Sequence, residues 1–451
     1  MKHPISDIIQ THKGGLPVGI YSVCSANPYV LRATMLQAKK DETSLLIEST
    51  SNQVNQFGGY AGMTSEKFTS AVKEIARSVH FPQENLIFGG DHLGPNPWQN
   101  ERSHEAMKKA SDLVAASVSA GYSKIHLDTS MRCLDDAGST TLDAEIVAER
   151  AAQLCKTSES VVQTNSLNNI KPLYVIGTDV PIPGGAQEEL ADIHITQVDE
   201  VERTIELTKE AFLKQNLDEA WERVIAIVVQ PGVEFGNEWV TNYSPQKAEK
   251  LALFIENYDK LVYEAHSTDY QQKDDLSQMV KDHFAILKVG PWLTFAFREA
   301  LFALANIEKE WLSVRKGITP SNLIDVIEKT MNENPLYWKN HYHGDKNELA
   351  FAFKYSHSDR IRYYWPFPEI DSSLNKLLNN LQSNSIPLTL LSQFLPTQYQ
   401  AVTKGQIQNT PEELIYHKIN EVTSIYAEAT QLANKEKPSQ AVIESSFDER
   451  R

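Results

Sequence analysis

The sequence contains little cysteine and no long apolar segment. Its 451 residues include three cysteines, Cys24, Cys133 and Cys155, without the Cys-x-x-Cys spacing of redox and zinc-finger motifs. A disulfide framework and a thiolate zinc site are therefore excluded as the basis of the fold. No run approaches the ~20 apolar residues of a membrane span, and the first residues lack the apolar stretch of a signal peptide. We expect a cytoplasmic protein that does not insert into a membrane.

Positively charged residues are also fewer than negatively charged ones. The chain has 43 Lys and Arg residues against 59 Asp and Glu, a formal net charge of −16, and it shows no basic stripe. Nucleic-acid binding needs a clustered positive field, so this class of partner is disfavoured. A sugar phosphate remains a compatible ligand, because one local Lys or Arg beside a helix N-terminus suffices to hold a phosphate.

The glycine motifs that cradle nucleotide phosphates are absent as well. The pairs Gly58-Gly59 and Gly184-Gly185 each follow a predicted strand and would let the backbone approach a ligand closely. Neither stretch matches the patterns GxGxxG or GxxxxGKS/T. We therefore expect no nucleotide cofactor, and neither a Rossmann fold nor a P-loop kinase is supported.

What the sequence does contain is a series of eight short apolar runs, most of them followed by a stretch of helical length. Continuous runs of this kind are typical of parallel strands that are buried on both faces. Their alternation with helices predicts an α/β fold, a (β/α)8 TIM barrel, with a doubly wound open sheet as the alternative. The runs occupy residues 16–24, 44–50, 85–92, 124–130, 173–179, 224–230, 261–266 and 284–290.

After the eighth run the alternation of strands and helices gives way to a helical pattern. Residues 1–305 are predicted to form the barrel, and residues 306–434 a C-terminal helical extension that packs on it. The polar segment 435–451 is predicted to be a tail. Within the extension, Arg360 and Arg362 could reach a phosphate over the barrel mouth, although packing between the two parts is the interpretation that we favour.

Polar residues lie at the end of almost every predicted strand. In a parallel barrel all strands point the same way, so their carboxyl ends converge on one mouth. A hydrogen-bond network that only supports the barrel is the alternative, but burying so many polar groups in one layer is costly without a use. We therefore expect a divalent metal such as zinc, with an acid/base residue beside it. The residues are Asn27, Glu48, Asp91, His92, Asp128, Asp179, Gln230, Glu264, His266 and Lys288.

Individual roles follow from residue chemistry. His92 and His266 are candidate metal ligands, and the amide oxygen of Gln230 is a third unless it closes the turn that follows it. Asp91 adjoins His92 but would point to the other side of an extended backbone, which suits an acid/base role over shared ligation. Its alternative role is to cap the next turn. The candidates for substrate binding, with Lys288 suited to an anion, are Asn27, Glu48, Asp128, Asp179, Glu264 and Lys288.

Longer stretches around these residues form a specific pattern. They include Gly89-Gly90-Asp91-His92-Leu93-Gly94-Pro95-Asn96-Pro97 and Glu264-Ala265-His266-Ser267-Thr268-Asp269-Tyr270-Gln271, together with residues 19–26, 50–60, 229–235 and 360–366. The pattern closely resembles the GatZ/KbaZ family, the Z subunit associated with class II D-tagatose-1,6-bisphosphate aldolase. The resemblance runs over essentially the full length of the chain.

This resemblance implies a role in galactitol, N-acetylgalactosamine or tagatose 6-phosphate catabolism. The Z protein is described there as an accessory subunit, required for full activity and stability of the catalytic Y subunit. A Y-type aldolase subunit would then be the partner of this chain, and a homo-oligomer is the other assembly to consider. An older naming of such proteins as tagatose-6-phosphate kinases has no support from the glycine motifs.

The family in turn looks like a distant relative of class II aldolases. The correspondence matches Asp91 to the catalytic acid, His92 to the first zinc ligand and His266 to the third. Gln230 stands where a second histidine is expected, and residues 267–269 replace a glycine-rich phosphate loop, changes that would weaken zinc and bisphosphate binding. Two functions stay open: the accessory subunit, and a metal-dependent ketose or ketose-phosphate epimerase or retro-aldol enzyme that acts on its own through Asp91, His92 and His266.

Overall fold

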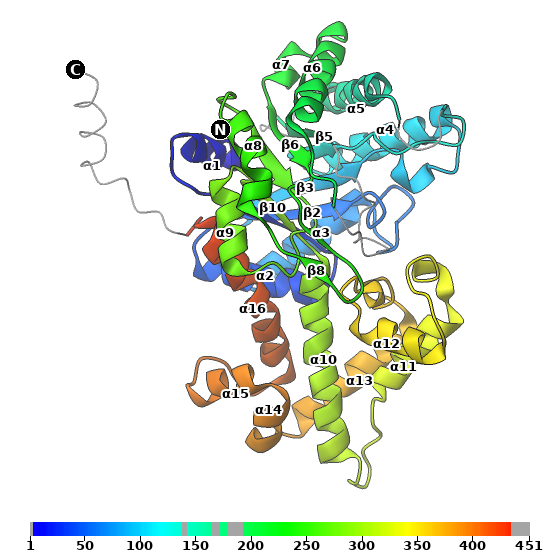
Figure 1. The fold of residues 1–451 in the computed structure, drawn as a ribbon. Helices are drawn as coiled ribbons and strands as arrows, with labels where there is room; N and C mark the ends of the chain where they lie inside the picture. The colour runs from blue at the N-terminus through cyan, green and yellow to red at the C-terminus, as the bar shows by residue number, and fades with distance from the viewer. Residues whose placement is uncertain (1–2, 138–141, 165–170, 178–192, 434–451) are drawn as a thin grey trace, which may run out of the picture.

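The computed structural model describes residues 3–137, 142–164, 171–177 and 193–433. Eight parallel strands close into a barrel in the order β1-β10-β9-β6-β5-β4-β3-β2 (Figure 1). The predicted α/β TIM barrel is thus confirmed. The strands are β1 (Ile20–Cys24), β2 (Leu45–Thr50), β3 (Leu86–Leu93), β4 (Lys124–Leu127), β5 (Leu173–Gly177), β6 (Val224–Val229), β9 (Val262–Ala265) and β10 (Ile286–Val289).

The barrel interior changes from apolar to polar along the strands. Helix α1 (Pro4–Lys13) buries one face of isoleucines, which pack with residues at the strand starts such as Ile20 and Ile87. The helix therefore covers the amino-terminal end of the barrel. Further along the strands the buried side chains are charged, for example Glu48 and Lys124. The polar side chains that could take part in a reaction therefore lie at the carboxyl end of the barrel, where TIM barrels have their active sites.

Amphipathic helices cover the outside of the strands. Their buried faces join the outer faces of the strands in one continuous apolar core, which explains why the strands are rich in apolar residues. A short antiparallel hairpin of β7 (Glu234–Phe235) and β8 (Val240–Thr241) follows β6. The helices are α2 (Pro28–Lys40), α3 (Ser65–Ser78), α4 (Ser103–Ser119), α5 (Ala144–Thr164), α6 (Val198–Lys214), α7 (Asp218–Trp221), α8 (Pro245–Ile255) and α9 (Lys273–Lys281), with 3-10 turns η1 (Gln83–Asn85) and η2 (Asn96–Trp98).

The last helix of the described chain returns to the barrel wall. Helix α16 (Pro411–Thr430) packs against α2, α9, α10 and β1, and the Gly19 N–H donates to the Thr430 carbonyl at 2.9 Å. Helix α10 (Pro291–Leu312) instead follows β10 and leads away from the barrel (Figure 1). The outer ring between α9 and α2 is thus completed by α16, from the far end of the sequence.

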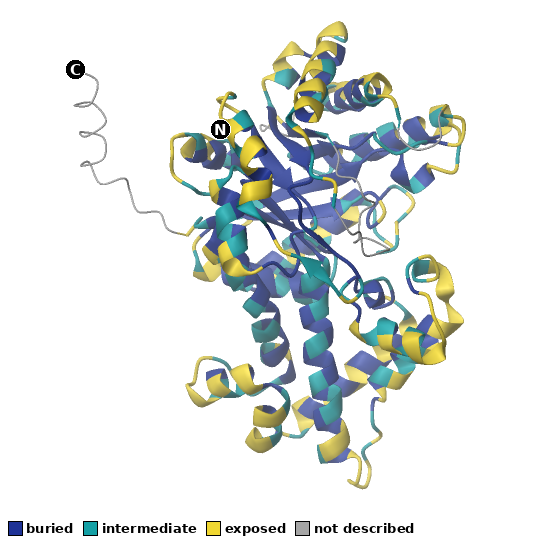
Figure 2. Ribbon diagram, viewed as in Figure 1, coloured by how far each residue is buried: buried dark blue, intermediate teal, exposed yellow. Residues whose placement is uncertain are grey.

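The remaining helices form the extension below the barrel, with exposed outer faces (Figure 2). The predicted boundary at residue 305 falls inside α10, and the predicted tail lies outside the described residues. Among the described residues, no helix is both long and apolar enough to span a bilayer. The elements are α11 (Leu323–Glu333), α12 (Lys346–Tyr355), α13 (Pro368–Ser383), α14 (Leu388–Phe394) and α15 (Pro396–Thr403), with turns η3 (Pro335–Tyr337) and η4 (Arg360–Tyr363).

Because α16 is part of the barrel wall, a cavity in this helix should destabilise the barrel itself. The Ile419 side chain is fully buried, and its replacement in Ile419→Ala is expected to lower the free energy of unfolding by about 2–5 kcal/mol. Urea unfolding followed by tyrosine and tryptophan fluorescence would measure this loss. The exposed control Glu428→Ala on the same helix should behave like the wild type, and equal stability of both variants would contradict the assignment.

Candidate functional site

A bulge in β3 brings Asp91 and His92 to the same side of the strand. The register with β4 shifts between Gly90 and Leu93, and His92 has a left-handed backbone with φ of 49°. The two side chains lie together in the barrel mouth, with Asp91 Oδ2 3.8 Å from His92 Nε2. The expectation that they point to opposite sides was wrong, because it assumed a regular extended backbone, which a bulge interrupts.

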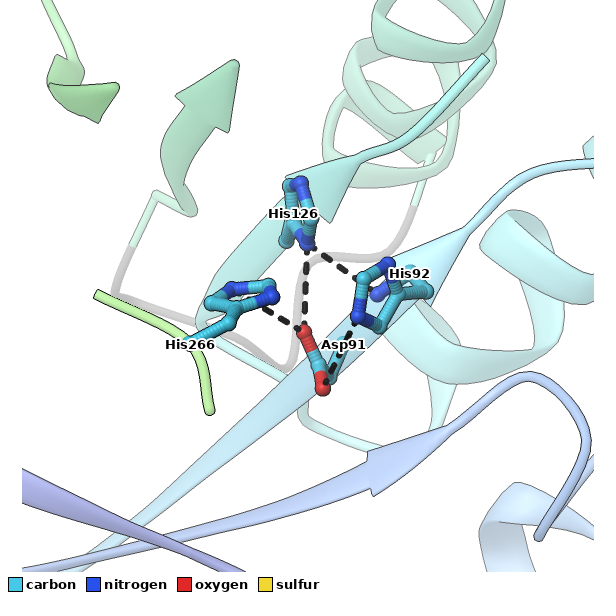
Figure 3. Close-up of side chains that lie close together, drawn as sticks. All are labelled: Asp91, His92, His126 and His266. Atoms are coloured by element: carbon cyan, nitrogen blue, oxygen red, sulfur yellow. Dashed lines mark hydrogen bonds and ion pairs between the residues drawn. The ribbon is translucent and has the colours of Figure 1, made fainter. Parts of the chain in front are cut away.

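Two further imidazoles complete a compact cluster around Asp91 (Figure 3). His126 comes from β4 and His266 from the loop directly after β9. One potential ligand atom from each of Asp91, His92, His126 and His266 can be chosen so that all four lie within 4.8 Å of one another. All four residues are buried, so their lone pairs are shielded from competing water.

Hydrogen bonds behind the imidazoles fix their orientation. His92 Nδ1 lies 2.7 Å from Asp128 Oδ2, and His126 Nε2 lies 3.0 Å from the Gly177 carbonyl oxygen. Because both oxygens accept, each ring nitrogen donates, and in the neutral rings His92 Nε2 and His126 Nδ1 carry the lone pairs. Carboxylate and carbonyl partners of this kind are the usual supports of metal-binding histidines.

The cluster has the donor set of a site for a divalent cation. Three imidazoles and one carboxylate are ligands that zinc and related metals accept. Asp91 Oδ1 lies 3.1 Å from His126 Nδ1, and the His92 backbone N–H donates to the same nitrogen at 3.2 Å. A metal ion bound by His126 would replace this backbone contact. The residues present fit a metal ion because four ligand atoms of suitable type lie within 4.8 Å of one another.

A layer of buried ion pairs lies beneath the cluster. Lys124 Nζ is 2.6 Å from Glu48 Oε1 and 2.5 Å from Glu264 Oε2. Lys288 Nζ contacts Glu48 Oε2 and lies 3.0 Å from Asp91 Oδ1. Both glutamates that were predicted to bind a substrate are thus paired with buried lysines. Contact between these glutamates and a substrate stays a prediction.

These contacts set the charge of the cluster. Burial alone would raise the pKa of Asp91, but the positive charge of His92 and the contacts with His126 and His266 outweigh it and hold that pKa below its usual range. Burial would lower the pKa of His92, but Asp91 and Asp128 raise it to about 9. Burial lowers the pKa of Lys288 to about 8. Asp91 is therefore a carboxylate at neutral pH.

Two other predicted residues, Asn27 and Gln230, have partners in the local backbone. Asn27 caps α2, and its Oδ1 accepts the Tyr29 N–H at 2.9 Å. Gln230 Oε1 accepts the Gly232 N–H at 2.7 Å, which is the turn-closing role considered for it above. Asp179 lies outside the described residues. Substrate binding by Asn27 and Asp179 and metal ligation by Gln230 stay predictions.

The cluster opens into a cavity of about 130 Å³ at the barrel mouth. A second cavity of about 270 Å³ adjoins it, because Cys24, Tyr60, Gly290 and Arg362 line both. The walls come from strand ends, from the loop after β2 and from Arg362 and Tyr363 of the extension. Together they provide a concave polar site next to the cluster, as expected for a small-molecule site.

The sequence interpretation missed His126 and Lys124. The segment from Lys124 to Asp128 alternates polar and apolar residues, and a period of two places Lys124, His126 and Asp128 on one face of a strand. We considered only the residue that closes the strand. The alternation within an otherwise apolar barrel strand was the available signal.

The buried ion pairs predict a large difference between two lysine substitutions. In Lys124→Met, Glu48 and Glu264 each lose a buried counter-charge, and we expect a loss of about 3–5 kcal/mol in the free energy of unfolding. The control is Lys171→Met, which breaks an exposed pair with Glu219 and should leave stability unchanged. Urea unfolding at pH 7 measures both, and equal effects would contradict the role of Lys124.

The raised pKa of His92 predicts a falling stability with pH in metal-free protein. The pKa of His92 is 6.5 in the unfolded chain and about 9 in the folded protein, so between these pH values the folded state binds a proton that the unfolded state has lost. The contribution of this proton to stability is complete below pH 6.5 and decreases above it by up to about 1.4 kcal/mol per pH unit. Urea unfolding in EDTA between pH 6.5 and 8 should show this slope. His92→Gln should reduce it, and an unchanged slope in the variant would refute the assignment.

Comparison with known proteins shows the family to which this chain belongs. A family model described as "D-tagatose-1,6-bisphosphate aldolase subunit GatZ/KbaZ-like" matches residues 5–431. The crystal structure of a probable tagatose 6 phosphate kinase from Sinorhizobium meliloti 1021 is 41% identical, with a TM-score of 0.83 over 91% of this chain and 100% of that chain.

Two remote structures were also found. The YdjI aldolase from Escherichia coli K12 is 12% identical with a TM-score of 0.41, covering 78% of this chain and 94% of its own. The fructuronate-tagaturonate epimerase UxaE from Cohnella laeviribosi is 10% identical with a TM-score of 0.44, covering 92% of this chain and 81% of its own. Because the family model matches nearly the whole chain and a solved relative is 41% identical to it, the chain belongs to the GatZ/KbaZ-like family of D-tagatose-1,6-bisphosphate aldolase subunits.

Proposed function

We propose that this chain is itself a metal-dependent catalyst that acts on a ketose phosphate in the barrel mouth, by retro-aldol cleavage or epimerisation. The observation that carries the proposal is the convergence of Asp91 with three oriented histidines in a buried cluster next to an open cavity. A barrel with only a supporting role has no evident reason to maintain such a costly arrangement. Membership of an aldolase-related family supports the same class of chemistry.

The proposed ligands are His92 through Nε2, His126 through Nδ1 and His266, with zinc as the metal. This set replaces Gln230, whose amide oxygen is engaged in a turn, with His126. When bound, the metal would polarise the carbonyl group of the ketose as a Lewis acid. The orienting contacts from Asp128 and Gly177 support this assignment, because they turn the lone pairs of His92 and His126 towards the cluster.

Asp91 is the candidate acid/base residue. It is a carboxylate at neutral pH, and Lys288 Nζ lies 3.0 Å from its Oδ1. In a retro-aldol step Asp91 would accept the proton of the hydroxyl group β to the ketone. The carbon–carbon bond then breaks, its electrons pass to the enolate, and the hydroxyl carbon becomes an aldehyde. Return of the proton during recombination on the opposite face would give the epimer.

The family description favours a second function, that of an accessory subunit. A GatZ/KbaZ-like chain is described as a subunit of D-tagatose-1,6-bisphosphate aldolase, which supports association with a Y-type catalytic subunit. In this role the chain would stabilise and activate its partner in cytoplasmic galactitol, N-acetylgalactosamine or tagatose 6-phosphate catabolism. Phosphoryl transfer is not proposed, since the sequence contains no GxxxxGKS/T motif.

Metal content and activity of the isolated chain test the proposal together. Wild-type protein is expected to retain zinc after dialysis, measured by mass spectrometry, and to convert tagatose 6-phosphate without a partner. His126→Ala should lower zinc occupancy at least tenfold and remove turnover. His194→Ala, which changes an exposed histidine paired with Glu200, is the control and should keep both.

The same assays separate the two functions. Tagatose 6-phosphate, tagatose 1,6-bisphosphate and free ketoses are each tested with and without a Y-type subunit. Metal-free protein that is inert alone but raises the activity of the Y-type subunit would exclude the catalyst and leave the accessory role. Turnover by the isolated chain that His126→Ala abolishes would establish the catalyst.

A further inference from the structure

Arg362 carries a positive charge from the C-terminal extension to the barrel mouth. It lies in turn η4 and lines the same cavity as Asp91 and His92. The turn is held there by an edge-to-face contact between Tyr363 and Tyr60, whose ring centroids are 4.4 Å apart. The extension thereby forms part of the wall of the candidate active site.

The guanidinium group of Arg362 keeps hydrogen-bonding capacity for a ligand. Its Nη1 donates to the carbonyl oxygens of Ser358 and Asp359, and its Nη2 donates to the Tyr363 hydroxyl at 3.0 Å. These three bonds leave part of the five-donor fork unused. The three acceptors are neutral oxygens, and within the described residues the guanidinium group forms no ion pair at salt-bridge distance. Burial raises the pKa of the carboxyl groups of Asp269 and Asp359, and the charge of Arg362 opposes this rise.

Ser51 provides an independent sign of a missing ligand. This residue follows directly after β2, is fully buried and lines the same cavity as Arg362. Among the described residues, its hydroxyl group has no hydrogen-bond partner. A buried hydroxyl without a hydrogen-bond partner carries a desolvation penalty, so a ligand that pairs with it would remove a cost that the free protein bears.

A carboxylate in the wall of this cavity is already engaged by backbone donors. Asp269 also lines the cavity, but its Oδ1 accepts the backbone N–H groups of Gly290 and Trp292, at 3.0 and 2.8 Å, at the start of α10. Asp269 therefore pairs with the positive end of a long helix, which offsets its charge. Arg362 remains available to an anion.

We propose that Arg362 and Ser51 bind the phosphate group of a phosphorylated ketose whose carbonyl end reaches the histidine cluster. The inference rests on the proposed function and specifies its substrate class. A planar guanidinium fork matches the oxygens of a phosphate group, and its charge-assisted hydrogen bonds are stronger than those to a neutral hydroxyl. The extension would thus select phosphorylated over free sugars.

Binding measured by calorimetry tests the proposal without relying on turnover. The wild type is expected to bind tagatose 6-phosphate at least tenfold more tightly than tagatose, because the free sugar lacks the charge-assisted hydrogen bonds of the phosphate group. In Arg362→Gln this preference should disappear while the affinity for tagatose is unchanged. Ser51→Ala should reduce the preference several-fold, and it offers a second route if the arginine variant fails to fold.

Arg360 provides the matched control. It lies two residues away and also stacks on Tyr363, but its Nε donates to the Tyr337 carbonyl at 2.6 Å and it does not line the cavity. Arg360→Gln should therefore keep the preference for tagatose 6-phosphate. Loss of preference in Arg360→Gln but not in Arg362→Gln would overturn the assignment.

The remaining outcomes are also decisive. Equal affinity of the wild type for the two sugars would refute the phosphate site, as would inorganic phosphate that binds through Arg362 without being displaced by tagatose 6-phosphate. Zinc content of the same samples keeps the two proposals apart. If the protein takes up no metal but binds tagatose 6-phosphate selectively, the proposed catalyst is refuted and the phosphate site is retained. If turnover depends on zinc but shows no preference for the phosphorylated sugar, the phosphate site is refuted and the catalyst is retained.

Discussion

Lys124 pairs with Glu48 and Glu264 across the interior of the barrel, and the geometry of the mouth depends on this contact. The three residues come from β4, β2 and β9, which are not neighbours in the ring. A charge buried at this depth is costly unless it is paired, so each side chain is held by its partners in one position. Lys288 extends the pairing to Asp91, and the base of the cluster is thereby fixed before any ligand binds.

Above this layer, backbone geometry decides what the cluster contains. The bulge in β3 turns His92 into the mouth beside Asp91, at the cost of a left-handed conformation for a residue with a side chain. Such conformations persist where surrounding contacts stabilise them, and they are frequent at functional sites. Here the bond to Asp128 supplies one such contact. The strain and the orientation of His92 are parts of the same arrangement.

The C-terminal extension contributes to the barrel in two separate ways. Helix α16 completes the outer ring between α9 and α2, whereas turn η4 brings Arg362 to the mouth. A catalyst for phosphorylated ketoses uses both contributions, because one stabilises the barrel and the other adds a positive charge to its cavity. An accessory role would need the first contribution but gives no reason for the second.

The sequence by itself determined the eight strands, their parallel direction and the gathering of polar residues at their carboxyl ends. Apolar runs and their spacing are local properties, and Asp91 and His266 reach the same mouth because parallel strands end there. It did not determine which side chains meet there. His126 joins the cluster through barrel closure, His92 through a bulge, and Arg362 through a turn that lies far away along the chain. These contacts depend on register, backbone torsion and long-range packing, which the spacing of residues along one strand does not encode.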